Sequence, residues 1–593
     1  ERDMERTSPG IDAAPGAAAD GRSHLVADAR NSIVISATVR VAFFAPLALF
    51  AWAAWTRRWV ADDGYIYLRV VRELVGGHGP VFNGGERVEA ATSPLWVGIL
   101  ALADSLHLPI SLPWLAVILG LSFSVAGLAF ALFAATDLWR RDARVLLPFG
   151  ALVVIALPPF WDFATSGLET GLSFVWLGAT FYVLVRAGAA IRSAASAGRL
   201  RTALFLALAG LGPLIHPDFA IFTLAFIAAF FVVAGESRPL RRFEALVVAL
   251  FIPGLYELFR MGYYGALVPN PAFAKEAGTS NWPQGWHYLL DTVNPYWLAI
   301  PLLLVVAMAL HVSRDADRST SALVFAPIGA AIAHGLYVVY VGGDFMHTRY
   351  FLPDIFAFAL PIAVIPFDAR PRVAAALAMA VWALVCAAML HVPYSGVGPH
   401  DIANEREIYV TLSGNAHPIT VEDYAQSSGE VAAAFGAYNL APGSLRLVHG
   451  FQTKLRGDLA DTRLLEAEQI GIFSYVVPPD VYVEDRYGLA DALASHIKLE
   501  QRGRPGHEKE LAEAWIVARF TDPGAKLPFV LGPPARDVAA ARAALVCDGP
   551  RELLAAATAP MSFGRFASNV VESFRSYGLR IPGDPKQAKA ELC

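Results

Sequence analysis

The sequence predicts a polytopic α-helical membrane protein of about eleven transmembrane helices, followed by a C-terminal extracytoplasmic soluble domain of the α/β type. Of the 593 residues, 55% are hydrophobic and 17% are charged, whereas soluble domains carry about 25% charged residues. The mean hydropathy is +0.46. Long apolar runs fill residues 34–392, while residues 393–593 mix charge, Pro and Gly, which is typical of a soluble domain.

Each span needs about 20 predominantly apolar residues. We expect spans at approximately 34–57, 113–138, 144–161, 170–190, 202–216, 218–235, 243–262, 292–312, 319–341, 350–367 and 372–392. The apolar segment 94–106 is short and better suits an interfacial helix within the extracytoplasmic loop 58–112. Residues 1–33, with four Arg among Ala, Gly and Asp, predict a disordered cytosolic tail.

The loop charges predict the orientation. Arg residues cluster in five loops that an eleven-span count puts on one side, at 140–144, 186–201, 238–242, 314–318 and 370–372. The positive-inside rule places these loops in the cytoplasm. The opposite loops and the final domain then lie outside a plasma (inner) membrane; these loops are 62–93, 162–169, 216–218, 263–291 and 342–349. The net charge of −5 gives no reason to expect a nucleic acid partner.

Short-range patterns divide the final domain into strands and helices. Alternating or short apolar runs predict strands at 444–448, 471–477 and 515–520. Helical periodicity predicts helices at 428–438, 487–498 and 534–546. We expect this domain, 393–593, to bind carbohydrate.

Asp62 and Asp63 follow the first apolar run directly. Carboxylates beside a membrane are costly and are a functional-site hypothesis by default. One of them is a candidate general base that takes a proton from an acceptor hydroxyl. An Asp here also suits an N-cap of the helix that continues through 65–74. The sequence therefore leaves open which of the two is catalytic.

Arg260, Lys275 and Arg349 fall on the extracytoplasmic side, where the positive-inside rule does not call for them. A guanidinium group grips two phosphate oxygens and an ammonium group offers a point charge, so we expect a lipid phosphate here. The other substrate-binding candidates of these loops are Tyr263, Tyr264, Asp344 and His347. The alternatives are a snorkelling Arg in an aromatic belt and an Asp–Arg pair that only closes its loop.

Three further candidates lie in the remaining outer loops. Arg87 stands in a loop dense in turn formers, Glu169 is suited to orienting a sugar hydroxyl, and His216 is suited to touching a phosphate or a sugar. Helix capping for the Glu169 segment and packing for His216 are the alternatives. No spacing predicts a tight metal site, so we expect no cofactor; a loosely held divalent cation at the departing phosphate is the alternative.

The chain has three cysteines. Cys386 lies in an apolar run and is expected to pack as a thiol. Cys547 and Cys593 both fall in the final domain, and we expect a disulfide between them if that domain is outside the cytosol; otherwise they remain free thiols.

Several stretches together resemble the GT-C class of polyprenyl-phosphate-dependent glycosyltransferases: Asp62-Asp63-Gly64-Tyr65-Ile66, Glu86-Arg87-Val88-Glu89 and Thr92-Ser93-Pro94. More narrowly, DFATSGLET, FRMGYYGALVP, GGDFMHTR, AHPITVEDY and SFGRFASNV are similar to the mycobacterial terminal β-(1→2) arabinofuranosyltransferases. The resemblance implies a GT-C-like catalytic domain over 34–392. It also implies the donor decaprenylphosphoryl-D-arabinofuranose, an acceptor at the non-reducing end of the arabinan of arabinogalactan or lipoarabinomannan, and Asp62 or Asp63 as base. If the donor is β-linked, a β product means net retention.

Two alternatives stay open at this point. One is another GT-C transferase that moves mannose or glucose, and the other is a transporter or flippase for a lipid-linked sugar. Transporters keep their sites near the membrane midplane and often show two related halves. Here the unusual charges gather in the loops of one face, which favours the enzyme.

Overall fold

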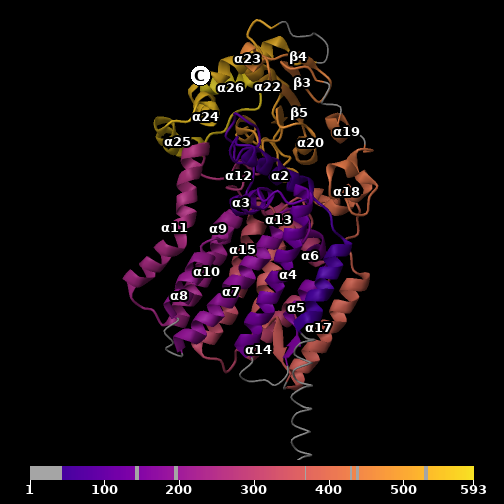
Figure 1. The fold of residues 1–593 in the computed structure, drawn as a ribbon, viewed down its shortest axis with the longest axis vertical. Helices are drawn as coiled ribbons and strands as arrows, with labels where there is room; N and C mark the ends of the chain where they lie inside the picture. Colours follow the sequence, from indigo (N-terminus) through magenta and orange to yellow (C-terminus); the bar gives the residue numbers. More distant parts are fainter. Residues whose placement is uncertain are drawn as a thin grey trace, which may run out of the picture.

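The computed structural model describes residues 43–139, 146–192, 198–367, 369–427, 430–435, 440–525 and 532–593. The predicted tail 1–33 lies outside these residues. Figure 1 shows a bundle of long helices with the C-terminal region stacked on one end of it.

Within the described ranges, six helices are long and apolar enough to cross a membrane. They are α4 (Leu112–Trp139), α7 (Thr170–Arg192), α10 (Ala220–Ala234) preceded by η1 (Pro217–Phe219), α11 (Pro239–Tyr264), α15 (Arg318–Val341) and α17 (Arg370–Met389). Shorter apolar helices are Phe43–Thr56, α3 (Pro94–Asp104), α8 (Gly198–Ala209) followed by α9 (Gly212–Ile215), and α14 (Ala299–Val312). All of them overlap predicted spans except α3, which coincides with the predicted interfacial helix.

Two predicted spans are built from short elements. The segment 144–161 contains β1 (Leu146–Pro148), α5 (Gly150–Ala156) and α6 (Pro158–Phe163). The segment 350–367 contains η2 (Arg349–Phe351), α16 (Leu352–Ala359), η3 (Leu360–Ile362) and β2 (Val364–Pro366). β1 pairs with β2 in antiparallel register. Proline recurs in both segments and interrupts them because it lacks the amide hydrogen that a continuous helix uses.

α4 and α7 pack closely because glycines line their contact. A Cβ atom added at Gly171 would lie 2.2 Å from the Gly120 carbonyl oxygen, and one at Gly178 would lie 2.5 Å from the Gly127 carbonyl oxygen. Small residues let membrane helices approach backbone to backbone, which strengthens van der Waals packing where no hydrophobic effect drives association.

The C-terminal region contains a four-stranded sheet in the order β4-β3-β5-β6. Its strands are β3 (Ser444–Arg446), β4 (Gln452–Lys454), β5 (Arg463–Ala467) and β6 (Val481–Asp485). β3 runs antiparallel to β4 and parallel to β5, and β5 runs parallel to β6. The helices are η4 (Pro399–Asp401), α18 (Glu405–Ser413), η5 (Val421–Tyr424), α19 (Glu430–Phe435), η7 (Gly457–Leu459), α20 (Ile470–Val476), α21 (Ala492–Ser495), α22 (Glu513–Phe520), α23 (Ala535–Leu545), α24 (Asp548–Thr558), α25 (Phe563–Ser576) and α26 (Pro585–Leu592).

Two of the predicted strands are helices in the structure. The segment 471–477 belongs to α20 and the segment 515–520 to α22, both almost wholly buried. A short apolar run that is buried on every side carries no periodicity that separates strand from helix. The predicted disulfide between Cys547 and Cys593 is present, and Cys386 is a buried free thiol.

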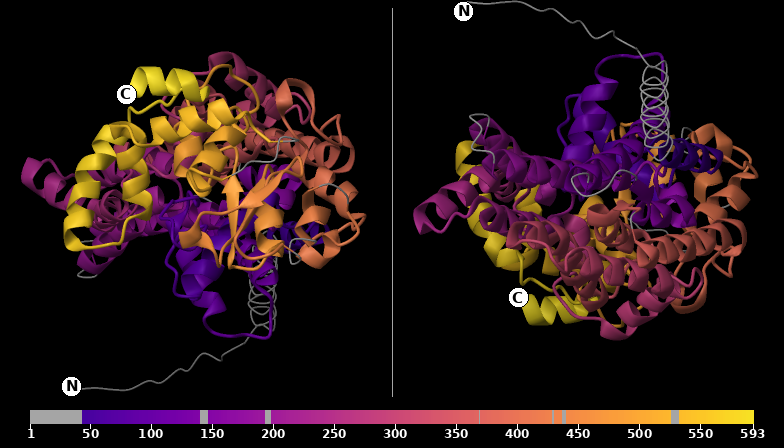
Figure 2. Two further views of the ribbon diagram at one scale, coloured as in Figure 1. Left: turned by 90° about the horizontal axis from the view of Figure 1, so that it is seen from above. Right: turned by 90° about the horizontal axis from the view of Figure 1, so that it is seen from below.

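The loops at the upper end of the bundle hold α2 (Asp62–Val75), α12 (Asn270–Ala274) and α13 (Trp282–Val293). The buried guanidinium group of Arg69 on α2 donates to the carbonyl oxygens of Ser474 and Val481, at 2.9 Å each. Asn83 bonds both backbone groups of Val483. Figure 2 shows the C-terminal region covering the bundle in the view from above. These contacts join it firmly to the loop 58–112.

Candidate functional site

The two adjacent carboxylates of α2 have different surroundings. Asp62 is buried, and its carboxylate accepts hydrogen bonds from the backbone N–H groups of Gly471 (3.1 Å) and Ile472 (2.8 Å) at the start of α20. It therefore caps a helix of the C-terminal region and not its own helix, whose N-cap is Ala61. Asp63 instead turns into a cavity, with 19% of its side chain exposed.

Arg349 lies at the centre of a group of three carboxylates. Its guanidinium nitrogens are 3.2 Å from Glu169, 3.4 Å from Asp344 and 3.6 Å from Asp63. The Arg349 side chain is only 7% exposed. Since a buried charge is stable only when it is paired, the carboxylates keep Arg349 in place and charged at the cavity wall.

Lys275 supplies a second cation. Its ammonium group lies 3.4 Å from Asp344, the carboxylate that also pairs with Arg349. The same ammonium group faces the rings of Phe345 and Tyr350. Burial would lower the pKa of Lys275, but the attraction of Tyr350 and Asp344 outweighs burial and raises it.

The charges of Lys275 and Arg349 both act on the pKa of Asp63. Burial raises the pKa of the Asp63 carboxyl above its usual range, the positive charges of Lys275 and Arg349 oppose this shift, and the neighbouring Asp344 and Glu169 add to it. A carboxyl group whose pKa is moved upward holds a proton more readily, which suits a group that accepts one during a reaction.

The cavity in front of these residues has a volume of about 130 Å³. Asp63, Lys275, Arg349 and the polar side chains of Tyr67 and Thr92 line one part of it. Its remaining wall is largely apolar and includes Ile66, Pro269, Pro271, Ala272, Val338, Val341 and Leu489, with His216 and Asp218 among its polar members. A largely apolar cavity with two cations in its wall suits the phosphate end of a lipid.

Asp63 also lines a second, polar recess on the side of the C-terminal region. Glu405, Tyr409, Tyr487 and Arg504 face this recess. Burial raises the pKa of Glu405 to about 8, and the charge of Asp63 adds to this shift. Asp63 thus stands between the apolar cavity and a recess whose hydroxyl and carboxyl groups suit a sugar.

The segment that carries Asp344 and Arg349 needs unusual backbone geometry. Gly343 has φ of 76°, and a Cβ atom there would lie 2.4 Å from the ring of Tyr288. The Tyr288 hydroxyl donates to the Met346 carbonyl oxygen and accepts from the Tyr350 N–H. Tyr288 on α13 therefore holds both ends of this segment against the bundle.

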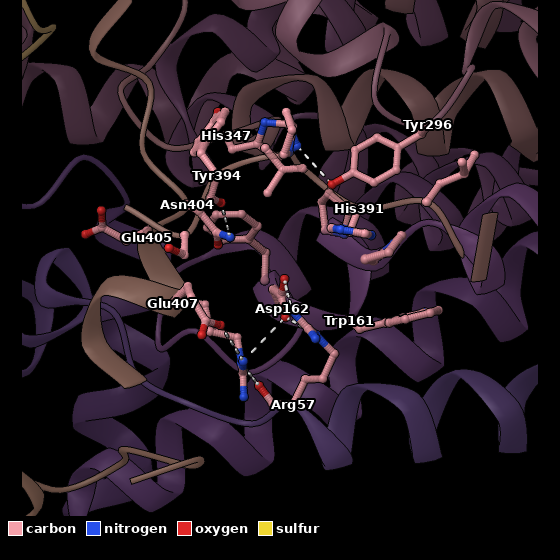
Figure 3. Close-up of a pocket in the computed structure, with 18 of the residues that line it drawn as sticks. Arg57, Trp161, Asp162, Tyr296, His347, His391, Tyr394, Asn404, Glu405 and Glu407 are labelled. Atoms are coloured by element: carbon pink, nitrogen blue, oxygen red, sulfur yellow. Dashed lines mark hydrogen bonds and ion pairs between the residues drawn. The ribbon is translucent and has the colours of Figure 1, made fainter. Parts of the chain in front are cut away.

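A larger cavity of about 590 Å³ lies beside the polar recess and shares Glu405 with it. Figure 3 shows the side chains at its wall, among them the pair Arg57–Asp162. His347 belongs to this cavity, where its imidazole contacts Asp291 (2.5 Å) and Tyr296 (3.0 Å). His347 is therefore not among the side chains that line the Asp63 cavity.

Besides His347, four predicted binding residues lie away from the Asp63 cavity. Arg260 is buried against Glu89 at 2.5 Å and also pairs with Glu257. Arg87 donates to the carbonyl oxygens of Tyr263, Ala556 and Ala559. The remaining two, Tyr263 and Tyr264, pack beside these arginines. Arg87 joins its loop to the C-terminal region, and Arg260 joins α11 to the loop that carries Glu89. The sequence did not distinguish this structural use from phosphate binding.

His216 does line the apolar cavity and begins a chain of acids and histidines. Its imidazole contacts Asp218, the other oxygen of Asp218 lies 3.3 Å from His334, and His334 lies 2.8 Å from Asp354. The sequence analysis missed Asp218, His334, Asp354 and Glu405 as neighbours of the site. An acid inside an apolar run was the available signal for Asp218 and Asp354.

Among the described residues, no group of three or more His, Cys, Asp and Glu side chains is placed to hold a metal ion. The positive charge at the cavity comes from Arg349 and Lys275.

The family model and the similar curated proteins agree on one family. The family model of the AftB family C-terminal domain matches residues 452–591. The chain is 33% identical to the terminal β-(1→2)-arabinofuranosyltransferase of Mycobacterium tuberculosis, over 91% of this chain and 94% of that protein. It is 34% identical to the protein of the same name from Corynebacterium glutamicum, over 90% of this chain and 85% of that protein. It is also similar to the crystal structure of ArnT from Cupriavidus metallidurans bound to undecaprenyl phosphate, with a TM-score of 0.41 and 15% identity over 79% of this chain and 91% of that chain.

Proposed function

The chain belongs to the AftB family of terminal β-(1→2)-arabinofuranosyltransferases, and we propose that it carries out arabinofuranosyl transfer at the carboxylate of Asp63. The reaction class is glycosyl transfer by a membrane protein. In this proposal the donor is decaprenylphosphoryl-D-arabinofuranose and the acceptor is the non-reducing end of a cell-wall arabinan. The observation that carries it is the position of Asp63 between an apolar cavity with two cations and a polar recess.

The donor phosphate lies against Arg349 and Lys275, with its polyprenyl chain along the apolar wall. Transfer breaks the bond between the anomeric carbon and the phosphate oxygen, and the electron pair leaves with the phosphate. These two largely buried cations stabilise the developing negative charge. Glu169 and Asp344 hold Arg349 in position for this task.

The acceptor hydroxyl enters from the recess lined by Glu405 and Tyr409. Its oxygen forms the new bond to the anomeric carbon and its proton passes to Asp63, which acts as general base. If the donor is β-linked, retention follows from a second route: Asp63 attacks the anomeric carbon as the phosphate leaves, and the acceptor oxygen then displaces Asp63 while its proton passes to the departed phosphate. Mass spectrometry of the quenched enzyme separates the two routes, because only the second adds a pentose to the peptide of Asp63.

We propose no resident cofactor, since the N–H groups of Arg349 and Lys275 can hold the phosphate oxygens. Transfer is then expected to persist in EDTA. A loss that Mg²⁺ restores would instead assign the phosphate to a divalent cation.

The C-terminal region belongs outside the plasma membrane in this proposal and helps to hold the polysaccharide. The disulfide between Cys547 and Cys593 supports this side, because disulfides persist in oxidising compartments. Arg238, Arg241 and Arg242 stand at the start of α11, at the end of the bundle away from the C-terminal region (Figure 1), where the positive-inside rule calls for cytoplasm.

The direct test is transfer by the purified full chain from labelled decaprenylphosphoryl arabinofuranose to an arabinan oligosaccharide, followed by linkage analysis. Terminal β-(1→2) arabinofuranose that is absent with Asp63→Asn supports the proposal. No transfer, or a preference for a mannosyl or glucosyl lipid donor, would overturn it.

A further inference from the structure

Helix α25 has its polar side chains turned inward and its apolar side chains turned outward. Asn569, Glu572, Ser573 and Ser576 are buried. In contrast, Phe563 is 90% exposed, Phe574 63% and Val571 52%. Helices on the surface of a soluble domain show the opposite arrangement, so the outward face of α25 is built for apolar surroundings.

The inward polar face fixes α25 against the end of α11. Asn569 donates to the Gly262 carbonyl oxygen and Ser576 to the Gly265 carbonyl oxygen. The helices also approach closely at this point, since a Cβ atom added at Gly262 would lie 2.1 Å from the ring of Phe566. The position of α25 relative to α11 is therefore rigidly set.

α11 carries an exposed apolar face up to this junction. Leu255 is 53% exposed and Leu258 is 49% exposed, and the helix is long and apolar enough to span a membrane. From Leu258 to Gly262 the helix rises by only about 6 Å. The outward face of α25 thus lies next to the exposed apolar face of α11; Figure 1 shows α25 beside the upper end of α11.

We propose that α25 lies on the bilayer surface as an amphipathic anchor of the C-terminal region. Phe563, Val571 and Phe574 enter the boundary between headgroups and acyl chains, as the apolar face of an interfacial helix does. Arg575 is exposed beside this face and meets lipid phosphates. The anchor holds the edge of the C-terminal region at the membrane beside the loops of the site.

The proposal is tested with the full chain in nanodiscs of phosphatidylcholine and phosphatidylglycerol. Phe563→Cys and Phe574→Cys are labelled singly with an environment-sensitive fluorophore; the unaltered chain is the background control, since Cys386 is buried and the other two cysteines are bonded. Ser568→Cys is the matched control, because it is exposed on the same helix but lies about 140° around the axis from Phe563.

We expect lipids with a doxyl group near the headgroup to quench the labels at 563 and 574 at least about twofold more than the label at 568. Iodide in the water should quench in the reverse order. Equal iodide quenching at all three positions without doxyl quenching would overturn the proposal. A third outcome would also overturn the proposal. If the labels are protected from both quenchers in discs that hold several chains but not in discs that hold one chain, the face of α25 docks on a second copy of the chain and not on lipid. The readout does not depend on sugar transfer, so it is independent of the proposed function.

Discussion

Replacing each of the two adjacent acids by its amide separates their roles. In Asp62→Asn the side chain keeps one oxygen for a backbone N–H of α20 but turns an NH₂ group toward the other. One charge-assisted bond is lost and a buried donor is left unpaired, which costs roughly 2–4 kcal/mol. In Asp63→Asn no helix cap is lost. Because burial raises the pKa of Asp63, removing its charge is expected to leave stability unchanged or slightly higher.

The activities are expected to change in the opposite order. Without its general base, Asp63→Asn should lose about 10²- to 10⁴-fold in kcat, whereas Asp62→Asn should keep most of its kcat per folded molecule. Thermal melting followed by tryptophan fluorescence measures stability, and transfer of labelled arabinose in single-turnover assays measures chemistry. If Asp63→Asn keeps more than a tenth of the activity while Asp62→Asn is inactive with an unchanged melting temperature, Asp63 is not the base and Asp62 is.

Three further predictions concern the cations and the disulfide. Arg349→Ala should raise the donor KM and lower kcat/KM by more than tenfold, with Arg349→Lys intermediate; an unchanged dependence on donor concentration would remove Arg349 from the site. Lys275→Met removes a charge that lowers the pKa of Asp63, so the acidic limb of the pH profile of kcat/KM should move to higher pH; a shift to lower pH would contradict the arrangement. The double variant Cys547→Ser/Cys593→Ser should lower the stability of the C-terminal region by about 2–4 kcal/mol, and equal melting temperatures would show that the bridge adds nothing.

The sequence could predict which loops share a face but not every role within them. Apolar runs and Arg clusters grouped Asp63, Lys275 and Arg349 on one side, and the structure brings these three together. Arg260 carried the same signal, an arginine on the outer side, yet it pairs with Glu89 and does not line the Asp63 cavity. Pairing between distant loops has no local signature, so a phosphate-binding arginine and a buried structural arginine look alike in sequence.

Two of the three strand predictions failed for a related reason, while the strand predicted at 444–448 is present as β3. In α20 and α22 the surroundings decide the conformation, because both segments are buried on almost every side. In α20 the helical form is also capped from outside by Asp62, a residue about 400 positions earlier. No window of neighbouring residues contains that information.

The same contact explains why two neighbouring acids have different surroundings, Asp62 as a structural cap and Asp63 as the proposed base. Successive residues on a helix point about 100° apart, so α2 directs Asp62 to the C-terminal region and Asp63 to the cavity. A Cβ atom added at Gly471 would lie 1.9 Å from the Asp62 carbonyl oxygen, so α20 touches the very turn of α2 that presents Asp63. The rotation of α2 about its axis, and with it the direction of the Asp63 carboxylate, therefore depends on how the C-terminal region is seated. A substitution that weakens the contact between α20 and α2 should therefore misalign Asp63 and lower kcat, even though it changes no residue that lines the cavity.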